Sequence, residues 1–373
     1  MSVDGLGSAT REPNMTTRRA ASPSLIDVAR AAGVSTATAG RALGGYGQVR
    51  AGTRERVLAA ATELGYRTNG LARSMITGST QTIGVVVTDV ANPFFATALR
   101  GITDVVQPAD FEVLLANTAS GLAAEQRAIT VMSEKRVDGV IVAAAQPSQG
   151  AHLKHAFDLG VPIVLLDRQV AGVADADSVT IDNEHAASEA VTHLLELGHR
   201  RIGVVTEAGH RLAALRGAGN RRKGLFPSAV RLRGYLHALR DAGIEIDETL
   251  IGSARYNRDS AYDATMRLLD TADPPTAVLC TDNVLASGAF RAGQDRGLRM
   301  PEQLSLIGFD DEPWTTLVRP ELTIMEQPTY ELGTQAGRQL LDRITGGRER
   351  RAHHVQLRAK LLVRGSTGPP ARR

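Results

Sequence analysis

The hydrophobic positions of this chain follow two different periodicities, and the change between them falls near residue 80. Between residues 24 and 67 they recur every three to four residues in short stretches, which is the period of amphipathic helices. After residue 80, short and continuously apolar runs alternate with longer amphipathic stretches. The pattern predicts a small all-helical domain followed by a larger α/β body.

The N-terminal pattern predicts three helices. The first begins at Ser24, where Asp27 completes a pattern that resembles a capping box, and it stops at Gly33. The second begins at once with Ser35 as its N-cap and ends at a pair of glycines. The third covers the stretch TRERVLAAATELGY and closes at Gly65. Three short helices with a tight, glycine-containing turn between the first two are typical of a helix-turn-helix.

The body alternates strand patterns with helix patterns. Its apolar runs are TIGVVVTDV, FEVLLANT, VDGVIVAA, VPIVLLD, RIGVVT, TAVLCTD and LSLIGFD, and the stretches between them include AAEQRAITVMSEK, HAASEAVTHLLELG and SAYDATMRLLD. Strands that are apolar throughout predict parallel sheets covered by helices on both faces. Because nearly 300 residues exceed the usual size of one hydrophobic core, we expect two α/β lobes.

The composition is that of an ordinary globular protein, with 43% hydrophobic and 22% charged residues. Residues 1–23 are rich in Ser, Thr, Arg, Gly and Pro and are predicted to form a disordered arm. No apolar run reaches the roughly 18 to 20 residues of a membrane helix, and the N-terminus lacks the apolar core of a signal peptide. We therefore expect a cytoplasmic protein without a membrane partner. The single cysteine, Cys280, lies in an apolar run and is expected to be a buried, inert thiol.

Charge is distributed unevenly along the chain. Residues 1–80 contain ten arginines and five acidic residues, whereas the whole chain has a net charge of only +3. A basic segment attached to a nearly neutral body is typical of nucleic-acid binding, although a solvated basic face is the simpler alternative.

The predicted second helix carries the candidate chemistry for DNA. Thr36, Ala37, Gly40 and Arg41 share one helical face, and the N-terminal half of a recognition helix meets base edges in the major groove. Arg41 is the best candidate for a bidentate contact to guanine. A plain helical bundle is the alternative interpretation, and these residues favour DNA.

Several longer stretches resemble the lac repressor/galactose repressor family of bacterial transcription regulators. They include LIDVARAAGVSTATAGRAL, TRERVLAAATELGYRTNGLARS, IGVVVTDVANPFF, EKRVDGVIV, HLLELGHRRIGVV, DDEPW and VRGST, and together they extend from Ser24 to about Thr367. The resemblance implies a helix-turn-helix, a hinge helix and a two-lobed body like a periplasmic sugar-binding protein. It also implies a homodimer on a near-palindromic double-stranded DNA operator and a small, sugar-like effector between the lobes.

The resemblance also implies domain boundaries. They are a helix-turn-helix at 24–67, a hinge helix and linker at 68–80, and a body at 81–367, in which lobe 1 comprises about 81–181 and 328–356 and lobe 2 about 182–327 and 357–367, before a tail at 368–373. The sequence VRGSTGPPARR carries no leucine heptads, so a dimer is expected rather than a tetramer held by a coiled coil.

The resemblance assigns DNA contacts to both the helices and the hinge. The candidates are Ser35, Thr36, Ala37, Thr38, Arg41, Asn69, Ala72, Arg73 and Met75. Arg50, which departs from the family pattern, is added as a candidate phosphate contact. In the family the hinge orders when two copies meet in the minor groove, and an apolar side chain, usually Leu, wedges between base steps. Met75 stands at that position, and packing of Met75 against the body is the alternative.

The chain departs from the family pattern at four positions. Ala39 and Gly40 replace the usual Val and Ser before the recognition arginine, so a helix-interior glycine weakens the helix by about 1 kcal/mol relative to Ala. A phosphate-contacting hydroxyl is also missing there. Arg50 replaces the usual capping Ser of the third helix, and Thr68 replaces the Pro at the hinge entry. These departures are expected to weaken operator affinity or hinge order unless other basic residues compensate.

Candidate effector residues follow the predicted strands. Asp167 with Arg168, Asp282 and Asp310 end apolar runs, and ligands of open α/β sheets bind beyond the carboxyl ends of strands. Each acid has a helix cap as its alternative role. The resemblance adds residues of the ANPFF segment, an effector-contacting arginine and two further polar positions; these are Asn92, Phe94, Phe95, Arg231, Tyr256 and Gln327. Both phenylalanines could equally belong to the core.

The remaining clusters indicate no further chemistry. The basic loop 207–223, with Arg221, Arg222 and Lys223, is expected to be a solvated loop rather than a phosphate site. The pairs His152/His155 and His353/His354 lack partners at metal-ligand spacing, so neither a metal nor a cofactor is expected.

An enzyme on a doubly wound fold is the chief rival interpretation, together with an effector-binding protein that has no operator-specific DNA binding. The sequence contains no Walker A pattern, no GxGxxG after a strand, no GxSxG and no HExxH. We therefore predict a regulator, most simply a repressor of a sugar or related metabolite operon, and not an enzyme.

Overall fold

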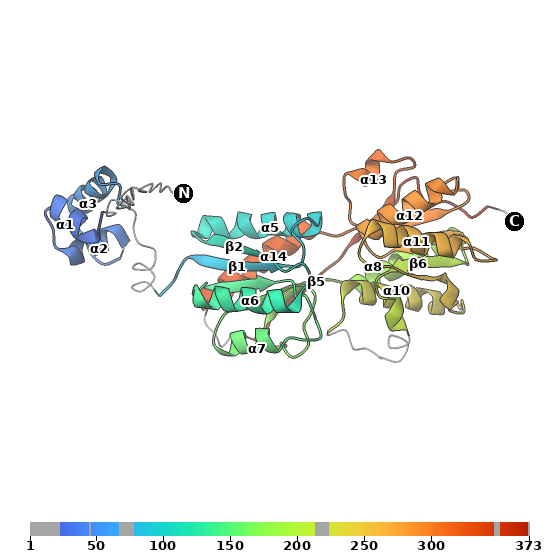
Figure 1. The fold of residues 1–373 in the computed structure, drawn as a ribbon, viewed down its shortest axis with the longest axis horizontal. Helices are drawn as coiled ribbons and strands as arrows, with labels where there is room; N and C mark the ends of the chain where they lie inside the picture. The colour runs from blue at the N-terminus through green and yellow to red at the C-terminus, as the bar shows by residue number, and fades with distance from the viewer. Residues whose placement is uncertain (1–22, 45, 67–77, 213–223, 347–350, 372–373) are drawn as a thin grey trace, which may run out of the picture. The chain divides into compact units, whose positions relative to one another are not determined.

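The computed structural model describes residues 23–44, 46–66, 78–212, 224–346 and 351–371. The chain divides into two compact units, residues 1–80 and residues 81–373 (Figure 1). No helix within the described ranges is long and apolar enough to cross a membrane.

The first unit contains the three predicted helices: α1 (Leu25–Ala31), α2 (Thr36–Gly44) and α3 (Ala51–Glu63). Both hydrogen bonds of the capping box between Ser24 and Asp27 are formed, and the hydroxyl of Ser35 accepts the Thr38 amide at 3.2 Å. Gly33 adopts a φ of +65° in the turn between α1 and α2, a conformation that favours glycine. A small apolar core of Val28, Ala39, Val57 and their neighbours holds the helices together. The predicted helix-turn-helix is confirmed.

The first lobe of the second unit is built on a six-stranded parallel sheet. Its order is β11 (His354–Leu357), β5 (Asp177–Ile181), β4 (Ile163–Asp167), β3 (Gly139–Val142), β1 (Thr82–Val87) and β2 (Glu112–Asn117). One face packs on α5 (Pro93–Val106) and α14 (Thr329–Gly346), and the other on α6 (Leu122–Glu134) and α7 (Ala151–Asp158), as Figure 1 shows.

The second lobe repeats this plan. Its sheet has the order β12 (Lys360–Leu362), β10 (Thr323–Glu326), β9 (Ser305–Phe309), β8 (Ala277–Cys280), β6 (Ile202–Thr206) and β7 (Ile251–Ser253). The covering helices are α8 (Asn183–Glu196) and α10 (Pro227–Asp241) on one face and α11 (Arg258–Leu269) and α12 (Asn283–Asp295) on the other. A short helix, α13 (Trp314–Leu317), follows β9. Cys280 is a fully buried free thiol.

The sheets differ from the expectation in one strand. Strand β12 runs antiparallel to β10, whereas every other pairing in both sheets is parallel. β12 follows β11, the edge strand of the first sheet, after only two residues, and it forms the edge of the second sheet beside β10.

The chain crosses between the lobes three times. The crossings follow β5, follow β10 and lie between β11 and β12. The observed architecture is the predicted one: a helix-turn-helix followed along the chain by a two-lobed α/β body. The predicted hinge helix and the arm lie outside the described residues.

Candidate functional site

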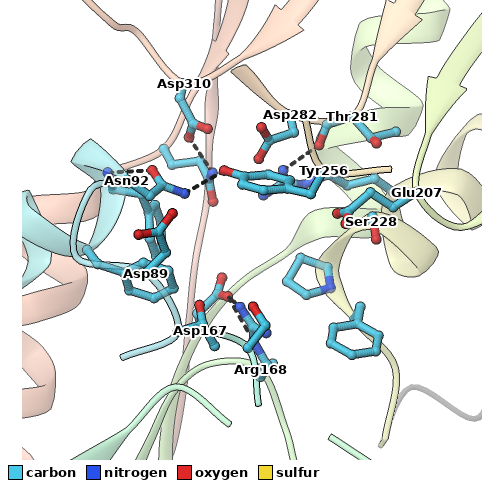
Figure 2. A pocket seen from close by; sticks show the side chains of 18 of the residues that line it. Asp89, Asn92, Asp167, Arg168, Glu207, Ser228, Tyr256, Thr281, Asp282 and Asp310 are labelled. Carbon is cyan, nitrogen blue, oxygen red and sulfur yellow. Dashed lines mark hydrogen bonds and ion pairs between the residues drawn. The ribbon is translucent and has the colours of Figure 1, made fainter. Parts of the chain in front are cut away.

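A cleft of about 370 Å³ lies between the two lobes of the second unit. It receives residues that follow strand ends in both sheets (Figure 2). All ten side chains predicted for an effector line it: Asn92, Phe94, Phe95, Asp167, Arg168, Arg231, Tyr256, Asp282, Asp310 and Gln327.

On the side of the first lobe, Asp167 and Arg168 form an ion pair at the end of β4. The Asp167 carboxylate accepts hydrogen bonds from Nε and Nη2 of Arg168 at 3.1 and 2.7 Å. Nη1 of Arg168 donates to the carbonyl of Ala144 at 3.2 Å. The charge of Arg168 is therefore matched by the chain itself.

On the side of the second lobe, Asp310 follows β9 and is buried. Its carboxylate accepts from Nε2 of Gln327 at 2.5 Å and from Nδ2 of Asn283 at 3.2 Å. Burial raises the pKa of this carboxyl, and Arg231 and Gln327 counteract the rise. Oε1 of Gln327 is buried without a hydrogen-bond partner in the described part of the chain. A ligand that donates a hydrogen bond would complete it.

Arg231 projects from α10 and is 4% exposed. Its Nε donates to Oδ1 of Asn183 at 2.7 Å, and its Nη1 donates to the carbonyl of Thr281 at 2.7 Å. The guanidinium lies 4.0 Å from the centre of the Phe309 ring. These contacts hold the guanidinium at the cleft wall.

Asp282 takes the helix-cap role that the sequence left open as its alternative. It is the N-cap of α12, where Oδ1 accepts the Val284 amide at 2.8 Å, and it also lines the cleft. Burial and then the nearby Asp310 raise the pKa of Asp282 to about 8.

Asn92 and Tyr256 connect the two walls. Asn92 caps α5 by accepting the Phe94 amide at 3.0 Å, and its Nδ2 donates to Oη of Tyr256 at 2.7 Å (Figure 2). Phe94 and Phe95 pack edge to face, with ring centres 5.1 Å apart. Both rings are buried in the core of the first lobe, as the core alternative expects, and both also line the cleft.

The sequence interpretation missed nine lining residues: Thr88, Asp89, Ala119, Ser120, Glu207, Phe226, Pro227, Ser228 and Thr281. Asp89 and Glu207 come just after β1 and β6, so the strand-end rule that found Asp167 would have found them. Burial raises the pKa of Glu207. The guanidinium groups of Arg168 and Arg211 lie over the ring of Phe226, at 5.8 and 5.4 Å from its centre, and no local sequence signal predicts these contacts.

The first unit displays a second candidate surface. Ser35, Thr36, Ala37 and Arg41 are exposed along α2, and Thr38 is partly buried. Arg50 is exposed at the start of α3, where its side chain forms no capping hydrogen bond. The hinge candidates Asn69, Ala72, Arg73 and Met75 lie outside the described residues.

The structure describes part of the histidine and basic clusters to which the sequence analysis assigned no chemistry. Nε2 of His152 lies 2.7 Å from Oε1 of the buried Glu125. No group of three potential metal ligands occurs within the described ranges. Arg221, Arg222 and Lys223 of the basic loop lie outside them.

Residues 24–69 match the family described as bacterial regulatory proteins, lacI family, and residues 191–367 match the periplasmic binding protein-like domain. The chain is 35% identical over 341 residues to the transcriptional repressor CytR of Escherichia coli strain K12. The aligned region covers 91% of this chain and 95% of CytR.

Two solved structures are also similar. The complex of the transcriptional regulator CelR with cellobiose has 32% identity and a TM-score of 0.66, and it covers 92% of this chain and 99% of CelR. The lac repressor dimer bound to operator and an anti-inducer has 26% identity and a TM-score of 0.78, and it covers 93% of this chain and 99% of the repressor.

These relatives are transcriptional regulators, which supports the predicted DNA-binding regulator over the rival enzyme. The helix-turn-helix, the two-lobed body and the similarity along nearly the whole chain lead to one conclusion. The chain belongs to the lacI family of bacterial regulatory proteins.

Proposed function

We propose that this protein is an effector-responsive repressor that binds a near-palindromic operator as a homodimer and takes a neutral, polyhydroxylated ligand in the cleft. One observation carries the ligand part. Side chains from the carboxyl ends of both sheets converge on a single cleft, so that a bound molecule contacts both lobes at once.

The charges of the cleft favour a neutral ligand over an anionic one. Five carboxyl groups line it, and even with Asp282 protonated at neutral pH the other four outnumber its two arginines. Five of the six side-chain nitrogens of Arg168 and Arg231 already donate to the chain, as described above. Sugar hydroxyls can donate to the carboxylates and to Oε1 of Gln327 and can also accept from the remaining donors. The cellobiose bound to CelR is a ligand of this class.

For DNA we infer that the exposed face of α2 enters the major groove, with Arg41 reading a guanine and Ser35, Thr36, Ala37 and Thr38 close to the duplex. Arg50 is proposed to contact phosphate. In the hinge, Asn69, Ala72, Arg73 and Met75 are proposed to bind the minor groove. Loss of DNA bending in Met75→Ala, and its retention in Met75→Leu, would support the wedge, and unchanged bending in Met75→Ala would refute it.

The homodimer is supported by the similarity to the lac repressor, whose dimer is bound to operator. Two copies present two recognition helices, which matches the two half-sites of a palindrome. A repressor of chromosomal operons works in the cytoplasm, and we propose that location.

The test begins with the purified full-length protein and sheared genomic DNA from the source organism. Fragments that the protein retains are sequenced, and a duplex carrying the shared sequence is used in gel shifts. We expect salt-dependent, sequence-specific binding, and at least one sugar or nucleoside from a panel of neutral compounds should change the affinity. Retention of no specific sequence would refute operator binding, and a response only to phosphorylated compounds would refute the neutral ligand.

A further inference from the structure

We propose that Tyr46 contacts the DNA backbone, with its hydroxyl donating to a phosphate oxygen beside the exposed face of α2. This inference rests on the proposed operator binding and adds a residue that the sequence motifs do not identify. It begins from two glycines one helical turn apart, Gly40 and Gly44.

The two glycines leave an open strip on α2, and the tyrosine covers it. A Cβ atom added at Gly44 would collide with the ring of Tyr46, so the ring occupies the space of a side chain at that position. A Cβ atom added at Gly40 would lie 3.6 Å from Oη of Tyr46. The ring therefore lies against the end of the helix, and the hydroxyl points back toward Gly40.

This places the hydroxyl beside the face proposed to read DNA. Residues 36, 37, 40 and 41 share that face, and the side chains of Thr36, Ala37 and Arg41 are exposed on it. The turn after Tyr46 also lies beside Arg41, because a Cβ atom added at Gly47 would come within 3.2 Å of Cδ of Arg41. The phenol and the recognition arginine thus belong to one continuous surface.

Packing against Gly44 explains the position of the ring but gives the hydroxyl no role. Tyr46 does not belong to the apolar core of this unit, against which the other tyrosine, Tyr66, packs. Among the described residues, no hydrogen-bond partner of the Tyr46 hydroxyl is found. A partly buried ring with an unoccupied donor beside a DNA-binding helix suits a phosphate oxygen, which is a common partner of tyrosine in protein–DNA complexes.

The chemistry predicts how binding should change. A phosphate contact carries no sequence information, so its loss weakens binding to every duplex alike. The phenol is neutral and displaces no counterion, so the slope of affinity against salt concentration should stay the same. A basic phosphate contact would instead reduce that slope.

The experiment compares Tyr46→Phe, which removes only the hydroxyl, with the matched control Tyr66→Phe. Both are made in the full-length protein and titrated with the duplex recovered from genomic DNA and with a random-sequence duplex. We expect Tyr46→Phe to bind both duplexes about threefold to tenfold more weakly, with an unchanged salt slope and thermal midpoint. We expect Tyr66→Phe to bind DNA like the wild type.

Two further variants separate the hydroxyl from the ring. Gly40→Ser in the Tyr46→Phe background restores a hydroxyl to the face, and the space at Gly40 admits it, so binding should recover in part. Gly44→Ala should displace the ring and weaken binding although the hydroxyl remains. Wild-type affinity in Tyr46→Phe, or a loss confined to the selected duplex, would overturn the inference. If the wild type binds neither duplex, the proposed operator binding itself fails.

Discussion

Asp167 and Asp310 occupy equivalent positions in the two lobes and face the same cleft (Figure 2). Each stands at the carboxyl end of the third strand of its sheet, counted from the β11 or β12 edge. Both adopt left-handed backbone conformations, with φ values of +69° and +67°. Such a conformation costs a non-glycine residue about 1 to 2 kcal/mol, and residues of this kind gather at binding sites. The charge of Asp167 also raises the pKa of Asp310.

The first prediction concerns the ligand response. An effector controls DNA binding only if it favours one arrangement of the lobes, and the typical coupling is about 1 to 3 kcal/mol. We expect Asp310→Ala to leave operator affinity without ligand nearly unchanged and to abolish the effect of the ligand in gel-shift titrations. The exposed substitution Asp263→Ala on α11 is the control. A wild-type response in Asp310→Ala would contradict the cleft assignment.

Arg231→Ala should lose the same response, but at a greater cost in stability. The variant leaves Oδ1 of Asn183 and the carbonyl of Thr281 without their buried donor. We expect the free energy of unfolding to fall by about 2 to 4 kcal/mol in urea titrations. DNA binding should therefore be measured at a temperature where the variant remains folded. An intact ligand response in the folded variant would show that Arg231 is dispensable.

The second prediction concerns the role of Arg41 in reading the operator sequence. If its exposed guanidinium reads a guanine, Arg41→Ala should weaken binding to the selected operator by about 1 to 3 kcal/mol. Binding to a random-sequence duplex should change little. An equal loss on both duplexes would identify Arg41 as a phosphate contact instead.

The third prediction is a pH dependence that originates at Asp282. Its folded-state pKa of about 8 lies above the unfolded value, so the folded chain holds an extra proton between about pH 4 and 8. Raising the pH through this window should destabilise the folded wild type. Asp282→Asn keeps the cap of α12 but cannot ionise, so its thermal midpoint should exceed that of the wild type by a margin that grows toward pH 9.

That margin should correspond to roughly 2 kcal/mol in the free energy of unfolding. It is smaller than the full pKa shift of Asp282 implies, because the buried carboxyl groups of Asp310 and Glu207 titrate together with it and still ionise in the variant. Asp263→Asn on α11 is the matched control. Parallel pH profiles for Asp282→Asn and the wild type would contradict the prediction.

The fourth prediction concerns a buried ion pair in the first lobe. Asp177 accepts hydrogen bonds from Nε and Nη2 of Arg343 at 2.8 and 2.7 Å and from the amide of His353 at 2.6 Å. Asp177→Ala strands a buried guanidinium, so we expect a loss of about 3 to 5 kcal/mol in the free energy of unfolding. Asp158→Ala breaks the exposed pair with Lys154 and should cost less than about 1 kcal/mol. Equal losses in the two variants would refute the distinction.

The strands predicted from the sequence are largely apolar runs, and the predicted acids stand at or just after the ends of these runs. Asp167, Asp282 and Asp310 were found because each ends or follows such a run. Strand β5 was missed because its buried residues include Asp177 and Ser178, whose polarity is offset by partners far away in the chain. Strands β7 and β12 have only three residues each, too few for a recognisable period.

The residues of the candidate surfaces that the sequence did not predict are also placed by contacts between distant parts of the chain. Phe226 reaches the cleft through contacts with Arg168 and Arg211, and Tyr46 reaches α2 because two glycines leave room for it. Such contacts depend on the folded path of the backbone rather than on the local pattern of residues. Periodicity could therefore predict the scaffold and the strand-end acids, but not the aromatic residues that complete each surface.

The three crossings between the lobes determine when this protein can finish folding during its synthesis. Sheet strands β11 and β12 come from residues 354–362, so the ribosome must make almost the whole body before either sheet has its last strand. A chain that stops before residue 354 lacks an edge strand in both lobes at once. Premature termination therefore cannot yield one finished lobe, and a nascent chain depends on its last residues to close both edges together.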